Sequence, residues 1–129
     1  MNPSSTVLIV EDNATNLKLA ADVLAHEGYG ILCARDTETA QEVLGETRPD
    51  LILLDLQLPG MDGLSFARLL KNDARYARIP IVAMTAFAMK GDNERAREAG
   101  CIGYIAKPID TRVFPGEVAE FLRLSGVSI

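Results

Sequence analysis

Three carboxylates of this sequence follow directly on short apolar runs. Glu11 and Asp12 come after the run at 6–10, and Asp55 comes after the run at 51–54, just ahead of a stretch rich in turn formers. Such a run is typical of a buried strand, so we expect each carboxylate at the end of a strand. A carboxylate there can bind a cation or act as a nucleophile, although it can also be an ordinary cap of a loop or helix.

Two further polar residues stand at the ends of later apolar runs. Thr85 follows the run at 81–84, and Lys107 follows the run at 103–106. By itself the first is an ordinary strand-end hydroxyl and the second a solvated surface charge. Together with the three acids, however, they supply a hydroxyl donor and an ammonium, which are the groups that a phosphoryl group needs. A lysine side chain can lean over the roughly 10 Å that separate next-nearest strands.

Five apolar runs alternate with five helical patterns along the chain. The runs lie at 6–10, 29–34, 51–54, 81–84 and 103–106, and the helical patterns lie at 13–28, 36–48, 63–70, 92–99 and before residue 124. Parallel strands need crossovers, and right-handed helical crossovers place helices on both faces of the sheet. The pattern therefore predicts a doubly wound α/β fold with a five-stranded parallel sheet.

The predicted site lies where the strand order reverses. If the order is 2-1-3-4-5, the first and third strands are neighbours, and Glu11, Asp12 and Asp55 leave the sheet on strands roughly 5 Å apart. Like charges this close raise one another's pKa unless a cation is bound among them. Oxygen ligands with no nearby histidine or thiolate suit Mg²⁺, so the sequence predicts a magnesium site.

Size and composition limit the alternatives. With 129 residues, 48% of them hydrophobic and 24% charged, the chain fits one globular domain over 1–129 with a core at 6–124. No apolar run approaches the roughly 20 residues that span a bilayer, and the first five residues do not resemble a signal peptide, so we expect a cytoplasmic protein with no membrane contact.

Charge and cysteine content narrow the choice of partners. The formal net charge is −5 and the pI is near 4.8, which disfavours direct binding of nucleic acid and favours protein partners. Cys33 and Cys101 are too sparse for a zinc site or a disulfide framework. We expect both to be small residues in or near the core.

The motifs at these strand ends are similar to those of one family. The segments that carry the similarity are VLIVEDN at 7–13, PDLILLDLQLPGMDG at 49–63, MTA at 84–86 and YIAKP at 104–108. Along nearly its whole length the chain resembles the receiver domain of two-component response regulators, whose fold is flavodoxin-like. The resemblance implies a phosphorelay domain that is not an enzyme beyond its own phosphorylation and dephosphorylation.

The resemblance also assigns roles at the predicted metal site. It implies that Asp55 is the phosphoacceptor, which takes a phosphoryl group from a histidine kinase or a histidine phosphotransfer protein and becomes an acyl phosphate. Asp12, Asp55 and the main-chain carbonyl of Gln57 would bind Mg²⁺, and Glu11 would act through bound water.

Further roles follow from the same resemblance. Thr85 and Lys107 would hold the phosphoryl oxygens, and the peptide bond between Lys107 and Pro108 would be cis. Thr85 would then move toward the phosphoryl group, and Tyr104 would turn inward as the switch aromatic. This shift would remodel the face made by the fourth helix, the fifth strand and the fifth helix, where an effector protein would bind.

Two places need separate comment. Pro115 falls where the last helix of a receiver is already under way, so this helix either starts late, near Phe114, or has a distorted first turn. Gln57 and Phe87 would flank the route of a hydrolytic water, and a bulky Phe87 would slow dephosphorylation.

Other functions fit the sequence less well. A receiver domain cut from a hybrid histidine kinase would carry the same residues as a stand-alone receiver. A Mg²⁺-dependent phosphatase of the haloacid dehalogenase type usually has a second acid two residues after its nucleophile, where this chain has Gln57. A flavin carrier would need a phosphate loop in place of Glu11 and Asp12, and a degenerate receiver would have lost some of the ionic residues.

Overall fold

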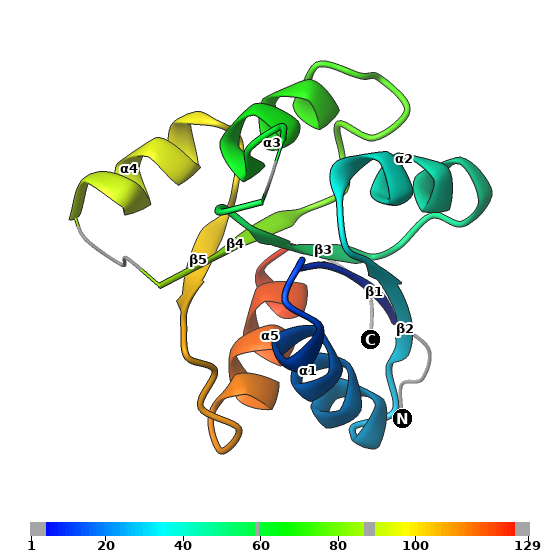
Figure 1. The fold of residues 1–129 in the computed structure, drawn as a ribbon, viewed down its shortest axis with the longest axis vertical. Helices are drawn as coiled ribbons and strands as arrows, with labels where there is room; N and C mark the ends of the chain where they lie inside the picture. The colour runs from blue at the N-terminus through cyan, green and yellow to red at the C-terminus, as the bar shows by residue number, and fades with distance from the viewer. Residues whose placement is uncertain (1–4, 59, 87–89, 126–129) are drawn as a thin grey trace.

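A parallel sheet forms the centre of the computed structural model, which describes residues 5–58, 60–86 and 90–125. The strands run in the order β2-β1-β3-β4-β5, and every neighbouring pair is parallel (Figure 1). Their bounds are β1 Thr6–Val10, β2 Gly30–Ala34, β3 Leu51–Asp55, β4 Ile81–Thr85 and β5 Gly103–Ala106. The predicted fold class and strand order are confirmed.

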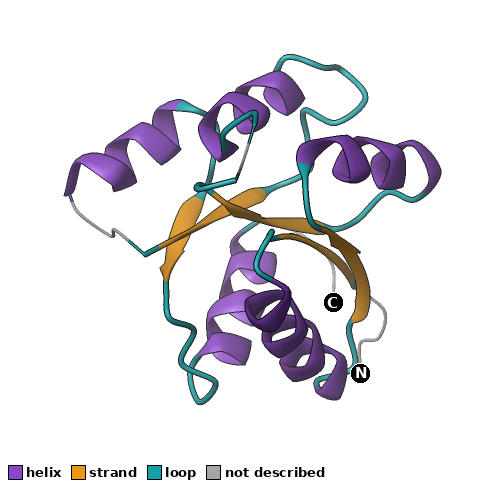
Figure 2. Cartoon of the chain, in the orientation of Figure 1, coloured by secondary structure: helices purple, strands orange, loops and turns teal. Residues whose placement is uncertain are grey.

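Five helices cover the two faces of this sheet. Their bounds are α1 Ala14–His26, α2 Thr37–Glu46, α3 Gly63–Lys71, α4 Lys90–Glu98 and α5 Phe114–Leu124. Figure 2 shows α1 and α5 together on one face and α2, α3 and α4 on the other. Asn13, Asp36 and Asp62 cap α1, α2 and α3, each accepting a hydrogen bond from a main-chain N–H three residues later.

The central strands are buried on both sides. In β1 and β3, neighbouring residues alternate between two apolar clusters, one under α1 and α5 and the other under α2, α3 and α4. Every residue of β3, including Asp55, is buried. Such burial leaves the sheet little freedom, so the strand ends are held in fixed positions.

None of the helices in the described part of the chain has both the length and the apolar character that a membrane span requires.

Several predicted helix ends are confirmed. The last helix begins at Phe114 with Pro115 in its first turn, where the missing N–H costs no helical hydrogen bond. Gly100 follows α4 with a φ of +106° and closes its end, because its N–H donates to Arg97 and the next N–H donates to Ala96.

The prediction for Cys33 was wrong. Cys101 is buried as expected, but Cys33 is exposed. The reason lies in the strand order, because β2 has a neighbour only in β1 and is therefore an edge strand. An apolar run of this length predicts a strand but does not say whether the strand lies in the middle or at the edge of the sheet.

Candidate functional site

The three predicted acids meet at the ends of two neighbouring strands. The register pairs Val10 of β1 with Leu54 of β3, so the residues that follow them leave the sheet together. Carboxylate oxygens of Glu11, Asp12 and Asp55 all lie within 4.8 Å of one another. The expected convergence of these acids is thus present.

Lys107 lies across the same edge and contacts two of the acids. Its Nζ lies 2.8 Å from Glu11 Oε1 and 3.4 Å from Asp55 Oδ2. The side chain of Lys107 is 12% exposed, and those of the two acids are 2% exposed. The lysine therefore reaches over β4 from the end of β5, as the strand spacing predicts.

The pKa values of Glu11 and Lys107 are both raised, for different physical reasons. Burial raises the pKa of Glu11, and the negative charge of Asp55 adds to the rise, although the hydrogen bonds from Lys107 and from the Asn13 N–H oppose it. Burial alone would lower the pKa of Lys107, but its hydrogen bond to Glu11 and the charges of both acids outweigh that effect and raise it. The ammonium is thus held firmly in its charged form.

The donor set fits a divalent cation. Three carboxylates and one ammonium leave two negative charges uncompensated within a few ångströms, and the acids offer oxygen ligands only. Asp12 is the acid of the three that lies half-exposed, so a hydrated ion can reach it. Glu11 already accepts from Lys107 and from the Asn13 N–H, which suits a role through water rather than direct coordination.

The main chain of Gln57 also lies at this site. Its N–H donates to Asp55 Oδ1 at 2.9 Å, which fixes the rotation of the carboxylate. This contact brings the peptide unit beside the proposed phosphoacceptor, while the role of the Gln57 carbonyl as a ligand stays a prediction.

Thr85 and Lys107 are tied to each other through the backbone. Thr85 ends β4, is 3% exposed, and accepts a hydrogen bond at 2.8 Å on its carbonyl from the Lys107 N–H. The peptide bond between Lys107 and Pro108 is cis, as predicted. Tyr104 is half-buried and packs against the apolar cluster under α2, α3 and α4.

Gly63 lies in close contact with the end of β3, the strand that ends at Asp55. A Cβ at this position would lie 2.5 Å from the Asp55 carbonyl oxygen and 2.6 Å from Leu56 Cα. Only a glycine fits there without moving the main chain. The sequence marked this residue as a turn former, but its contact with β3 depends on the tertiary structure.

Arg35 is a contact of the site that the sequence reasoning missed. It follows β2, and its Nε and Nη2 donate to the carbonyl oxygen of Asp12 at 3.2 and 2.8 Å. The available signal was its place at a strand end, because the strand-end rule that selects the acids, Thr85 and Lys107 applies equally to β2. Phe87, the residue predicted to slow dephosphorylation, lies outside the described residues.

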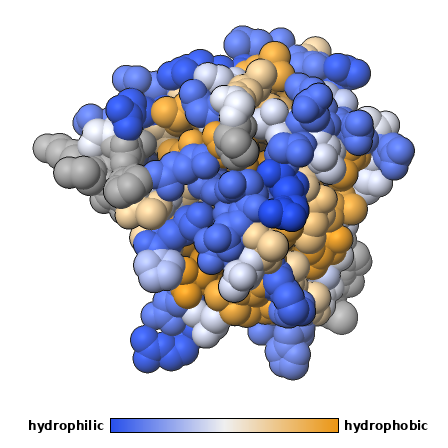
Figure 3. Space-filling view, viewed as in Figure 1, coloured by the Kyte–Doolittle hydropathy of each residue, from blue (hydrophilic) through white to orange (hydrophobic). Residues whose placement is uncertain are grey.

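The surface of the molecule agrees with an ionic site at this edge. Figure 3 shows hydrophilic residues gathered in the middle of the face turned to the viewer, between the two helical layers. Glu11, Asp55 and Lys107 lie largely below this surface, whereas Asp12 is half-exposed.

Comparisons with known proteins identify relatives over nearly the whole chain. Residues 7–118 match the family model described as the response regulator receiver domain. The polar-differentiation response regulator DivK of Brucella anthropi is 45% identical over 117 residues, which cover 91% of this chain and 95% of that protein.

Two solved structures from other bacteria have the same fold. The signal receiver domain of a signal transduction histidine kinase from Syntrophus aciditrophicus has a TM-score of 0.84 and 34% identity, covering 96% of this chain and 92% of that chain. The receiver domain of the sensor histidine kinase PA1611 from Pseudomonas aeruginosa has a TM-score of 0.81 and 34% identity, covering 95% of this chain and 98% of that chain. It has a magnesium ion coordinated in its active site cleft.

Proposed function

This chain belongs to the response regulator receiver family, and we propose that its Asp55 is the residue that accepts a phosphoryl group. The donor is a phosphohistidine on a histidine kinase or a histidine phosphotransfer protein. The observation that supports this proposal best is the meeting of Glu11, Asp12 and Asp55 within 4.8 Å, with the Lys107 ammonium in contact with two of them.

The transfer needs a nucleophile and groups that neutralise the charge of the phosphoryl oxygens, but it needs no general base. A carboxylate oxygen of Asp55 forms a bond to phosphorus while the phosphorus–nitrogen bond of the phosphohistidine breaks, and the electron pair of that bond stays on the imidazole nitrogen. In this proposal Lys107 neutralises a phosphoryl oxygen, which the 3.4 Å contact of its Nζ with Asp55 Oδ2 supports. The Gln57 N–H holds the carboxylate in one orientation.

The residues that would hold Mg²⁺ are the Asp12 and Asp55 carboxylates and the Gln57 carbonyl, with Glu11 acting through water. When bound, the ion neutralises charge on the phosphoryl oxygens. The magnesium ion in the cleft of the Pseudomonas receiver domain supports this assignment, and so do the two uncompensated charges of the present site.

The switch is proposed to connect Thr85 with Tyr104. Thr85 holds a phosphoryl oxygen and moves toward it, and Tyr104 turns into the space that is left. The half-buried position of Tyr104, on the strand next to Thr85, supports this exchange. The resulting population shift would change the face made by α4, β5 and α5, where an effector protein would bind.

Three aspects of this proposal concern the chain as a whole rather than the site. The whole chain, 1–129, is proposed to be one receiver domain of the DivK type, and the high coverage of the curated relatives supports this. The similarity to receiver domains of histidine kinases keeps the hybrid-kinase origin as the alternative, with the same chemistry at Asp55. The cytoplasmic location stays a prediction.

The test is to incubate the protein with acetyl phosphate, with and without Mg²⁺, and to measure its intact mass by mass spectrometry. We expect the mass of one phosphoryl group to be added in Mg²⁺ and not in excess EDTA. Asp55→Asn should remove the adduct, while Asp22→Asn, a change of an exposed acid on α1, should leave it unchanged. An adduct that forms without Mg²⁺ or persists in Asp55→Asn would contradict the assignment.

A further inference from the structure

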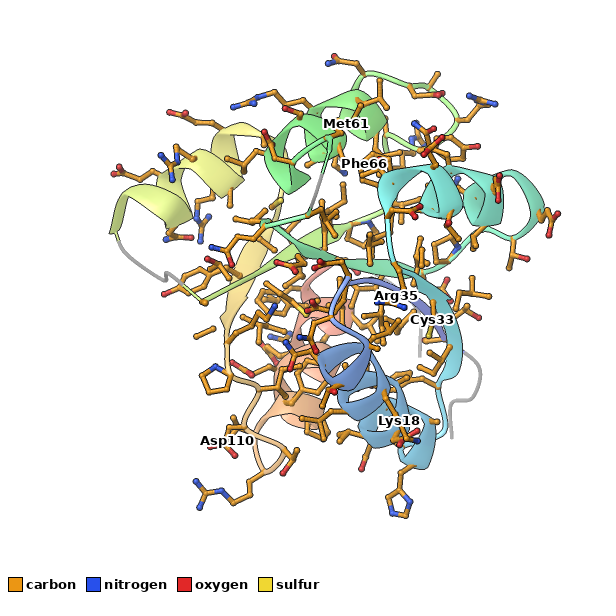
Figure 4. The ribbon with its side chains drawn as sticks, viewed as in Figure 1. Lys18, Cys33, Arg35, Met61, Phe66 and Asp110 are labelled. Carbon is orange, nitrogen blue, oxygen red and sulfur yellow. The ribbon has the colours of Figure 1, made fainter. Side chains whose placement is uncertain are left out.

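The end of β2 reaches the site through a side chain that carries no assigned role. Arg35 follows this edge strand, and its guanidinium donates two hydrogen bonds to the main-chain carbonyl of Asp12, at 3.2 Å from Nε and 2.8 Å from Nη2. Figure 4 labels Arg35 and Cys33 close together beside β2. Two donors of one rigid, planar group on one oxygen fix the position of that oxygen well.

The carbonyl of Asp12 lies ahead of the hydrogen-bonding ladder of α1. That ladder starts one residue later, where the Asn13 carbonyl accepts from the Leu17 N–H. The peptide unit of this carbonyl therefore does not take its position from the helical ladder. Its N–H, that of Asn13, donates to Glu11 Oε2 at 3.1 Å, and Arg35 holds its carbonyl side.

The last residue of β2, Ala34, and the residue after it, Arg35, hold the segment that carries Glu11 and Asp12. The Ala34 carbonyl accepts from the Glu11 N–H at 3.0 Å, and the Arg35 side chain donates to the Asp12 carbonyl. The first contact extends the pairing of β1 with β2 through the main chain. The second is made by a side chain, so it can be removed without breaking the sheet.

We propose that Arg35 is a positioning residue that sets the affinity of the Glu11, Asp12 and Asp55 cluster for Mg²⁺ by holding the Asp12 main chain. This inference rests on the proposed role of Asp12 as a magnesium ligand. Partners that orient a metal ligand typically change metal affinity by 10- to 100-fold when they are lost, and an exposed contact such as this one belongs at the lower end.

Electrostatics alone predicts the opposite sign. Arg35 is exposed and positively charged, so removing it would leave the surroundings of the cluster more negative and would slightly favour a cation. Weaker Mg²⁺ binding without Arg35 therefore indicates positioning rather than a charge effect.

The surroundings of Arg35 make a truncation easy to interpret. Arg35 lines a hollow of about 710 Å³ together with Asp12, Leu17, Cys33 and other residues of β2 and α2. Because the side chain lies along open space, shortening it leaves no gap in the core, and water can occupy its place.

The experiment titrates the full chain and its variants with Mg²⁺ in the absence of a phosphodonor. Binding is monitored through the amide chemical shifts in NMR spectra. Arg35→Ala should weaken Mg²⁺ binding about tenfold, and Arg35→Lys, which keeps the charge but loses the planar pair of donors, should lie between it and the unmodified protein. Arg48→Ala is the matched control, because Arg48 also donates to a main-chain carbonyl, that of Arg75, at 2.8 Å. It should bind Mg²⁺ normally.

Thermal unfolding in EDTA separates a folding defect from a binding defect, since Arg35→Ala should unfold close to the unmodified protein there. Arg35→Ala with unchanged or tighter Mg²⁺ binding, or equal weakening in Arg48→Ala, would overturn the inference. Asp12→Ala tells the two proposals apart. If Asp12→Ala binds Mg²⁺ normally, the proposed metal site is wrong. If Asp12→Ala loses Mg²⁺ binding and Arg35→Ala binds Mg²⁺ normally, only the proposed role of Arg35 is wrong.

Discussion

Replacing Gly63 by alanine should damage both stability and phosphoryl acceptance. The added Cβ would lie 2.5 Å from the Asp55 carbonyl oxygen and 2.6 Å from Leu56 Cα, closer than real Cβ contacts. Both neighbours are main-chain atoms at the end of β3, so relieving the contact requires a shift of α3 or of β3. Overpacking of this kind typically costs about 1–3 kcal/mol, and the rigid partners place Gly63→Ala near the upper value.

Two other glycines serve as comparisons for the predicted loss of unfolding free energy in Gly63→Ala. Gly45 lies exposed in α2 with nothing within 4 Å of an added Cβ, so Gly45→Ala should stabilise the protein by up to about 1 kcal/mol. An added Cβ at Gly103 would lie 2.5 Å from Phe121 Cε1, but the ring can turn away. Gly103→Ala should therefore cost about 1–2 kcal/mol.

Urea unfolding monitored by circular dichroism gives the free energy of unfolding of each variant. Gly63→Ala should also accept less phosphoryl group from acetyl phosphate than Gly103→Ala does, because only the former displaces the residues around Asp55. A Gly63→Ala variant as stable as Gly45→Ala, with normal phosphorylation, would refute the close approach of α3 to β3.

Three further predictions concern charge and thiols. Lys107→Met should lower the free energy of unfolding in EDTA by about 3 kcal/mol, because it leaves buried Glu11 and Asp55 without their cation; Mg²⁺ should restore part of this in thermal unfolding. A maleimide should modify exposed Cys33 and leave Cys101 intact, as peptide mass mapping would show. Burial raises the pKa of Cys101 from 9.0 to about 11, so between these values the unfolded chain binds fewer protons and stability should fall with rising pH by up to about 2 kcal/mol. Urea unfolding at several pH values should show this fall, and Cys101→Ala should remove it.

The sequence by itself determined the elements and most of the site. Apolar runs of strand length predicted five strands, and the polar residues that follow them predicted Asp12, Asp55, Thr85 and Lys107 as one group. The five strands are present, and Glu11, Asp12, Asp55 and Lys107 lie together because the carboxyl ends of parallel strands meet at one edge of a sheet. The roles of these residues and of Thr85 stay predictions. The alternation of strands and helices predicted a parallel sheet, but it fits more than one strand order, and the structure shows which one is present.

Only the tertiary structure decided which contacts these residues make. The reach of Lys107 to Glu11 joins residues 96 positions apart, the close approach of Gly63 to Asp55 depends on how α3 packs, and the exposure of Cys33 follows from the edge position of β2. Hydrophobic periodicity is a local property of the chain, whereas these distances depend on how whole elements pack against one another. The place of Arg35 directly after β2 was visible in the sequence, but its contact with the Asp12 carbonyl depends on how the chain after β1 lies against the end of β2.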